Sequence, residues 1–123
     1  MSISAVVTVK RVLWISRHPP LPKELEALEK AFGKVQVFQY AGRVKDAEHA
    51  VSLIKQYEAD EVVTILPLSV IMRLCELGLH PLWPECVQVR SGDYDFVDEG
   101  SGRKYRFVRF VRVKGVELKV EPL

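Results

Sequence analysis

A short segment near the N-terminus brings a hydroxyl, a guanidinium and an imidazole together where an apolar run ends. In WISRHPPLPKELEAL, residues 14–28, Ser16, Arg17 and His18 directly follow the apolar residues, and three prolines come next. An arginine fork binds phosphate oxygens, a serine hydroxyl can donate to them, and histidine is the residue that most readily exchanges a proton near neutral pH. We therefore predict that Ser16, Arg17 and His18 form a catalytic group for an anionic substrate.

Apolar residues recur at strand and helix spacing through the first two-thirds of the chain. Strand patterns cover residues 5–15, 34–40 and 61–67, and helical patterns cover residues 22–32, 44–58 and 68–77. The third strand is apolar almost throughout, which is typical of burial on both faces. The order of these elements predicts an α/β fold, a Rossmann-like three-layer sandwich with a central parallel sheet and right-handed crossovers.

The last third of the chain has no helical period and predicts antiparallel strands. LHPLWP, residues 79–84, begins a fourth strand that we expect the prolines to cut short. Hairpin turns are predicted at EGSG, residues 99–102, and at KG, residues 114–115. We therefore expect a single domain, with residues 1–85 as the α/β core and residues 86–123 as a β-hairpin extension.

RKYRFVRFVRVK, residues 103–114, is the strongest basic segment and interleaves arginines with aromatic residues. On a regular strand, alternate side chains face opposite sides. One face would carry Tyr105, Phe107 and Arg109, and the other would carry Arg106, Val108, Phe110 and Arg112. This pattern fits a strand covered on both faces, a subunit contact, a platform for stacking on bases, or simply a solvated charged hairpin.

Three loops should meet at the carboxyl edge of the predicted sheet, where ligands bind in open α/β folds. They contain Ser16 to His18, Arg43, and the turn from Pro67 to Ser69. Two of them open onto helix N-termini, whose unpaired N–H groups attract anions. The predicted ligand-binding residues are Arg43, Pro67, Ser69, Tyr105 and Arg109.

Composition narrows the classes of protein that this chain can belong to. Its 123 residues are 48% apolar and 28% charged, which fits one soluble domain. A net charge of +2 is too small to indicate bulk binding of duplex nucleic acid, and no apolar run is long enough to span a membrane. Cys75 and Cys86 are interpreted as reduced thiols of a cytoplasmic protein.

Motifs for cofactors and metals are missing from the sequence. There is no GxGxxG or Walker-type glycine loop, and no spacing typical of metal ligands, so we expect neither a cofactor nor a metal. His49 is predicted to lie in mid-helix facing solvent, and His80, which precedes a proline, is interpreted as structural. No Ser-His-Asp order supports a serine hydrolase.

Several of these stretches resemble the small CRISPR-associated Rossmann-like proteins of type III systems. ISRHPPLPKELEALEKAFG is similar to their opening strand and helix, which begin with Ser-Arg-His-Pro in one branch and Ser-His-Pro-Leu-Thr in another. TILPLSVIMRLCELGLHPLW resembles their third strand, Leu-Pro turn and helix, and YRFVRFVRV resembles a late strand. The chain has Pro20 where the first branch usually has glycine, and Arg17 is inserted relative to the second.

The resemblance implies a function as well as a fold. Some of these proteins are regarded as ring nucleases, which open cyclic oligoadenylate messengers without a metal and so switch off the antiviral response. They are typically homodimers that hold the ring across the dimer axis. The likeness maps Ser16, Arg17 and His18 to the opening motif, Pro67 to the third-strand turn, and Arg109 to the late-strand arginine.

Three hypotheses follow from the sequence. The first is a metal-independent ring nuclease acting on cyclic tetra-adenylate or a close relative. The second is a non-catalytic sensor or sponge that binds the same ligand with the same arginines. The third is a small α/β subunit whose basic hairpin docks a protein or RNA, chiefly through Arg106 and Arg112.

Overall fold

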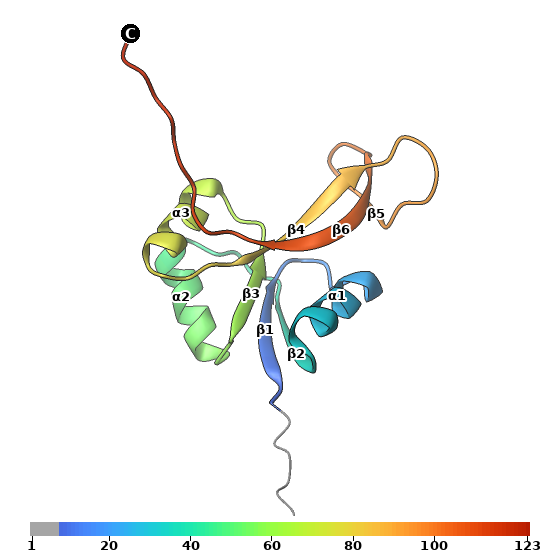
Figure 1. Cartoon of the computed structure of the whole chain (residues 1–123), viewed down its shortest axis with the longest axis horizontal. Coiled ribbons are helices and arrows are strands. Elements are labelled where there is room, and N and C mark those ends of the chain that lie inside the picture. The colour runs from blue at the N-terminus through green and yellow to red at the C-terminus, as the bar shows by residue number, and fades with distance from the viewer. Residues whose placement is uncertain (1–7) are drawn as a thin grey trace, which may run out of the picture.

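A six-stranded sheet with three helices forms the fold in the computed structural model, which describes residues 8–123 (Figure 1). The elements in chain order are β1 (Lys10–Ile15), α1 (Pro22–Phe32), β2 (Val35–Tyr40), α2 (Ala47–Gln56), β3 (Glu61–Thr64), α3 (Leu68–Glu76), β4 (Leu82–Gln88), β5 (Phe96–Val97) and β6 (Lys104–Arg112). The strand order is β2-β1-β3-β4-β6-β5. None of the helices within residues 8–123 is long and apolar enough to cross a membrane.

The sheet is mixed, with parallel strands in its first part and antiparallel strands in its last. Strand β1 pairs in parallel with β2 and β3, and β3 pairs in parallel with β4. Strand β6 then runs antiparallel to both β4 and β5. The predicted α/β class is confirmed, as are the alternating strands and helices from β1 to α3. Residues 5–7 of the first predicted strand lie outside the described residues.

The fourth strand is longer than the sequence pattern predicted. Strand β4 continues through Pro84 to Gln88, so the prediction that proline would end it is wrong. Its pairing with β3 is confined to Leu82, opposite Val63, and beyond that point no strand within residues 8–123 pairs with this edge of β4. Proline lacks an N–H group and is tolerated at such an edge. The expected division after residue 85 falls inside this strand.

The two faces of the sheet are covered by different helices (Figure 1). Alternate residues of β1 point to opposite sides. Val12 and Trp14 pack with Leu28 of α1, whereas Leu13 and Ile15 pack with Leu53 of α2. Strand β1 is therefore buried on both faces and lies at the centre of the core. The third strand is also buried, but it ends at Thr64, and the predicted strand residue Ile65 is exposed.

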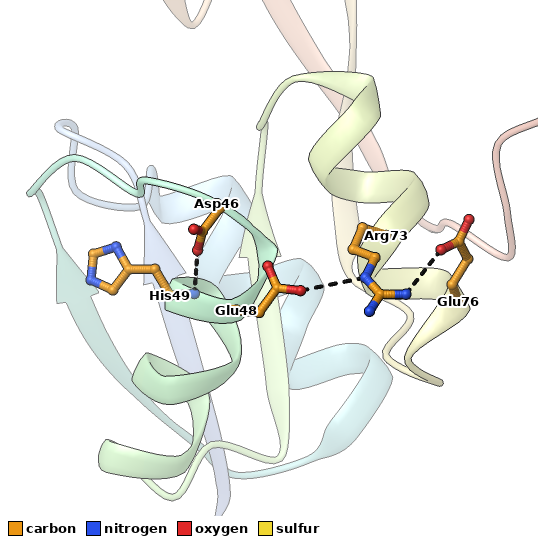
Figure 2. A network of polar contacts seen from close by, with 5 residues as sticks. All are labelled: Asp46, Glu48, His49, Arg73 and Glu76. Carbon is orange, nitrogen blue, oxygen red and sulfur yellow. Dashed lines mark hydrogen bonds and ion pairs between the residues drawn. The ribbon is translucent and has the colours of Figure 1, made fainter.

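Helix α3 packs on α2, on the face of the sheet opposite α1. Ala47 and Ala50 of α2 contact Leu74 of α3 in a buried cluster. Above this cluster, the guanidinium of Arg73 lies 3.4 Å from Glu48 of α2 and 3.2 Å from Glu76 of its own helix (Figure 2). These groups are exposed, so water screens them, and the ion pairs stabilise the contact only weakly.

The last two strands form an antiparallel ribbon with β4. The predicted turn at residues 99–102 is confirmed: Gly102 donates to the carbonyl of Asp98, and the Asp98 side chain accepts from Ser101. The second predicted hairpin, at residues 114–115, does not form. Residues 113–123 form no strand and extend away from the sheet (Figure 1).

A β-bulge in β6 changes which side chains share a face. Glu85 lies opposite Arg109, but Cys86 lies opposite Phe107, so Val108 is an extra residue in the ladder. The simple alternation predicted for this segment is therefore wrong. Phe107 and Phe110 contact each other with ring centroids 4.9 Å apart, and Phe110 also meets Trp14 edge-on at 6.1 Å.

Inserting an alanine directly after Val108 should show how much stability depends on the spacing that the bulge accommodates. The insertion shifts Phe110 by one position and turns it away from Phe107 and the core, because a one-residue slip inverts every later side chain. We expect a loss of about 3 kcal/mol or more in unfolding free energy, comparable to removing a buried aromatic ring. Urea unfolding measures this. Val108→Thr, at a side chain that is 45% exposed, is the control and should change stability by less than about 0.5 kcal/mol. Equal stability of the insertion variant would contradict this account of the bulge.

Candidate functional site

A cavity of about 480 Å³ lies where β1 and β3 end, between the β1–α1 loop and the β4–β6–β5 ribbon. This volume is within the usual range of small-molecule sites. The residues that line it come from four places: the end of β1 and the following loop, the start of α1, the end of β3, and the ribbon. They are Trp14, Ile15, Ser16, Arg17, His18, Pro19, Leu21, Glu24, Val63, Thr64, Ile65, Pro84, Cys86, Phe96 and Val97.

The predicted catalytic group, Ser16, Arg17 and His18, is held together at this cavity. The backbone of Ser16 continues the pairing of β1 with β2, because its N–H donates to the carbonyl of Tyr40 at 3.1 Å. The indole N–H of Trp14 donates to the carbonyl of His18 at 2.8 Å, and the N–H of His18 donates to Oγ of Ser16 at 3.2 Å. The loop is therefore held through its backbone and the Ser16 hydroxyl, and the side chains of Arg17 and His18 are not needed to hold it.

The side chains of Arg17 and His18 in this loop are accessible to a ligand. Arg17 and His18 are exposed, and among residues 8–123 neither side chain makes an ion pair or a side-chain hydrogen bond. Ser16 accepts at Oγ and keeps its own O–H for donation. A guanidinium, an imidazole and a hydroxyl with a free donor at the mouth of a cavity can bind a phosphodiester and exchange protons with it.

The ribbon supplies an apolar and aromatic wall that the sequence did not place at the site. Phe96 and Val97 of β5 and Pro84 of β4 line the cavity. Phe96 stacks on Tyr105 of β6, with ring centroids 5.5 Å apart and planes 18° from parallel. The predicted ligand-binding residue Tyr105 therefore supports the wall from behind. An exposed aromatic face beside a cavity is suited to stacking on a flat base.

Glu24 is a buried carboxyl in the same cavity. It is 7% exposed, and its Oε1 accepts the N–H of Leu21 at 3.0 Å. Burial raises the pKa of Glu24, the hydrogen bond from Leu21 lowers that pKa, and the nearby Asp95 carboxylate raises it. The pKa of the Cys86 thiol is raised as well, first by burial and then by Glu24 and other carboxylates. The inner wall of the cavity therefore favours neutral forms of both groups.

The loop after β2 does not line this cavity, and the loop after β3 lines it only at Ile65. Arg43, Pro67 and Ser69 were predicted to bind the ligand, but all three are exposed and none lines the cavity. Pro67 precedes the first turn of α3, and the carbonyl of Arg43 accepts from the hydroxyl of Tyr40 at 3.4 Å. The chain leaves β2 and β3 toward α2 and α3, on the face of the sheet away from the ribbon.

Arg109 also lies elsewhere, in a groove between α1 and β6 lined in part by Leu28, Phe110 and Arg112. Its guanidinium is 2.9 Å from the carboxylate of Glu85 on the neighbouring strand. Arg112 binds both carboxylate oxygens of Glu61, at 2.8 and 3.0 Å. Both arginines thus have carboxylate partners within their own chain, unlike Arg17.

The two remaining histidines have structural surroundings. His49 was predicted in mid-helix facing solvent, but it lies in the first turn of α2, where Nδ1 accepts the N–H of Lys45 at 3.1 Å and its own N–H donates to Asp46 at 2.7 Å (Figure 2). The carbonyl of His80 accepts a hydrogen bond from the guanidinium of Arg112 at 3.1 Å, as expected for a residue that supports the start of β4. Neither histidine lines the cavity.

Several lining residues were not predicted for the site, among them Glu24, Cys86, Phe96 and Val97. The position of Glu24 at the third residue of α1 was the available sign of a capping role. The ribbon residues carry no local signal, because only the pairing of β4 with β6 and of β6 with β5 brings them to the cavity.

No protein-family model, curated protein or solved structure matches this chain.

Replacing Trp14 by phenylalanine should loosen the loop while keeping an aromatic ring in the core. The variant loses the hydrogen bond to His18, which is worth about 1 kcal/mol, so the amides of residues 16–18 and 21 should exchange faster with solvent. Hydrogen exchange followed by mass spectrometry measures this. Trp83→Phe is the control, since Trp83 does not line the cavity, and it should leave exchange in this loop unchanged. Unchanged exchange in Trp14→Phe would show that the indole does not anchor the loop.

Proposed function

We propose that this protein is a metal-independent ring nuclease that opens a cyclic oligoadenylate, cyclic tetra-adenylate or a close relative, within a type III CRISPR antiviral system. The proposal includes a Rossmann-like three-layer sandwich as the fold and a homodimer as the active form. One observation carries it: Ser16, Arg17 and His18 line one cavity with an aromatic wall, and the side chains of Arg17 and His18 have no ion-pair or hydrogen-bond partner among residues 8–123.

The chemistry requires only groups that this cavity offers. Each ribose of a cyclic oligoadenylate carries a 2′-hydroxyl beside its phosphate, so the substrate contains its own nucleophile. The protein has to bend the ring into line, stabilise charge on the phosphate and move protons. Arg17 is placed to neutralise the phosphate, and His18 accepts the 2′-hydroxyl proton. The products are linear, with 2′,3′-cyclic phosphate ends.

The size of the cavity supports a second copy in the active form. A volume of about 480 Å³ suits one nucleotide, which leaves the rest of a four-nucleotide ring uncovered. A two-fold dimer repeats the same contacts on the other half of a symmetric ring. Ile65 lines the cavity while 61% exposed, and Leu68, at the start of α3, is equally exposed. A second chain would cover such apolar residues.

His18→Ala should slow cleavage by about 10²- to 10⁴-fold, the usual contribution of a general acid or base. Binding of the ring should be largely spared, because the histidine backbone, which holds the loop, is unchanged. Single-turnover cleavage of cyclic tetra-adenylate in the presence of a metal chelator measures the rate, and chromatography identifies the 2′,3′-cyclic phosphate. A wild-type rate in the variant would contradict the proton-transfer role.

Arg17→Ala should weaken binding of the ring and slow its cleavage, by about 10²-fold in rate. Arg109→Ala is the matched control, because it removes an arginine that is paired with Glu85 outside the cavity. Fluorescence titration with a 2′-O-methylated ring separates affinity from rate. If Arg109→Ala lowers affinity as much as Arg17→Ala does, the cavity assigned here is not the phosphate site.

A non-catalytic binder is the second candidate, favoured by the exposed aromatic wall, which stacks on bases whether or not a bond is broken. It predicts that the intact ring stays on the wild-type protein during the cleavage assay. Linear products identify the nuclease, and retained ring identifies the binder. Absence of both, with capture of RNA or protein that depends on Arg106 and Arg112, identifies the docking subunit.

A further inference from the structure

Capping of α1 accounts for only one of the two carboxyl oxygens of Glu24. That oxygen accepts the N–H of Leu21, and capping carboxyls at helix starts normally face solvent, where the helix dipole stabilises their charge. Here the group lies in the cavity wall and is 7% exposed. Among residues 8–123, no cationic side chain forms an ion pair with it.

The groups around Glu24 disfavour its charged form. Asp95, from the loop before β5, is a second carboxylate, which itself accepts from Lys23 at 3.2 Å and from the N–H of Phe107 at 2.8 Å. Cys86 of β4 is a thiol with a raised pKa. Lys23 pairs with Asp95 and not with Glu24, and Arg17 lies in the exposed part of the cavity lining. A buried carboxyl beside another carboxylate holds its proton to higher pH.

We propose that Glu24 is the general acid of the ring-opening reaction, donating a proton to the 5′-oxygen that leaves the phosphorus. This inference rests on the proposed function. His18 and Glu24 reach one cavity from different elements, a loop and a helix. Such an arrangement suits an in-line displacement, in which the attacking and leaving oxygens lie on opposite sides of the phosphorus.

The step balances without a metal or a redox partner. The 2′-oxygen forms a bond to phosphorus as its proton passes to the imidazole of His18. The bond from phosphorus to the 5′-oxygen breaks, and that oxygen takes the proton of Glu24. The products are a 2′,3′-cyclic phosphate and a 5′-hydroxyl, and solvent returns Glu24 and His18 to their starting states. Enzymes commonly combine general acid and general base catalysis by holding one group protonated and another deprotonated in the same site.

The variant Glu24→Gln separates this role from capping. The glutamine amide oxygen can still accept the Leu21 N–H, but the side chain has no acidic proton. We expect cleavage of cyclic tetra-adenylate to slow by about 10²- to 10⁴-fold, with unchanged affinity for a 2′-O-methylated ring. In the wild type the rate should fall as pH rises through the Glu24 pKa, and that fall should be absent from the variant.

A ring in which one 5′-oxygen is replaced by sulfur provides the decisive comparison. A thiolate leaves without protonation, so Glu24→Gln should cleave this linkage at close to the wild-type rate, whereas His18→Ala should remain slow. Loss of cleavage on both rings would assign Glu24 a structural role and overturn the inference. Wild-type cleavage of the ordinary ring by Glu24→Gln would overturn it while leaving the proposed function intact. Failure of the wild-type protein to cleave either ring would overturn both.

Discussion

The site depends on one hydrogen bond, from the indole of Trp14 to the carbonyl of His18. Trp14 is 4% exposed and packs among Val12, Leu28 and Phe110, so its ring is fixed by the core on the α1 side of the sheet. Its N–H is the polar handle that a buried tryptophan usually satisfies. Here the partner is the carbonyl of His18 in the loop. The loop backbone is therefore held in place by the core, while the side chains of Arg17 and His18 remain exposed. A catalytic group held in this way loses little further freedom when a ligand binds.

The β4–β6–β5 ribbon makes the second contribution to the site. It adds a wall beside the open end of the parallel strands, and a cavity results. Strand β4 extends past its contact with β3, and its free edge and the following strands stand beside the loop. The bulge at Val108 is part of this construction. It turns Phe107 and Phe110 to the same side, against Trp14, so the ribbon is anchored to the residue that also anchors the loop. Trp14 therefore holds both the β1–α1 loop and the ribbon that forms the cavity wall.

Local sequence pattern predicted the elements well and their final contacts poorly. Strand and helix periods located β1 to α3, and the run of Ser16, Arg17 and His18 at the end of a buried strand was correctly placed at the carboxyl edge of the sheet. Arg43 and Ser69 were grouped with them because loops after parallel strands share an edge. The chain instead turns away there toward α2 and α3. Phe96 and Cys86 could not have been predicted, since their positions depend on strand pairings between distant segments.

The most direct measurement of the central claim is a crystal structure of the protein with a cyclic tetra-adenylate whose 2′-hydroxyls are methylated and cannot attack. The account predicts a phosphodiester within hydrogen-bond distance of Arg17, a 2′-oxygen facing the imidazole of His18, and a base against Phe96 in the cavity at the end of β1. A ring seated in the groove of Arg109 and Arg112, or one that touches neither Arg17 nor His18, would contradict it.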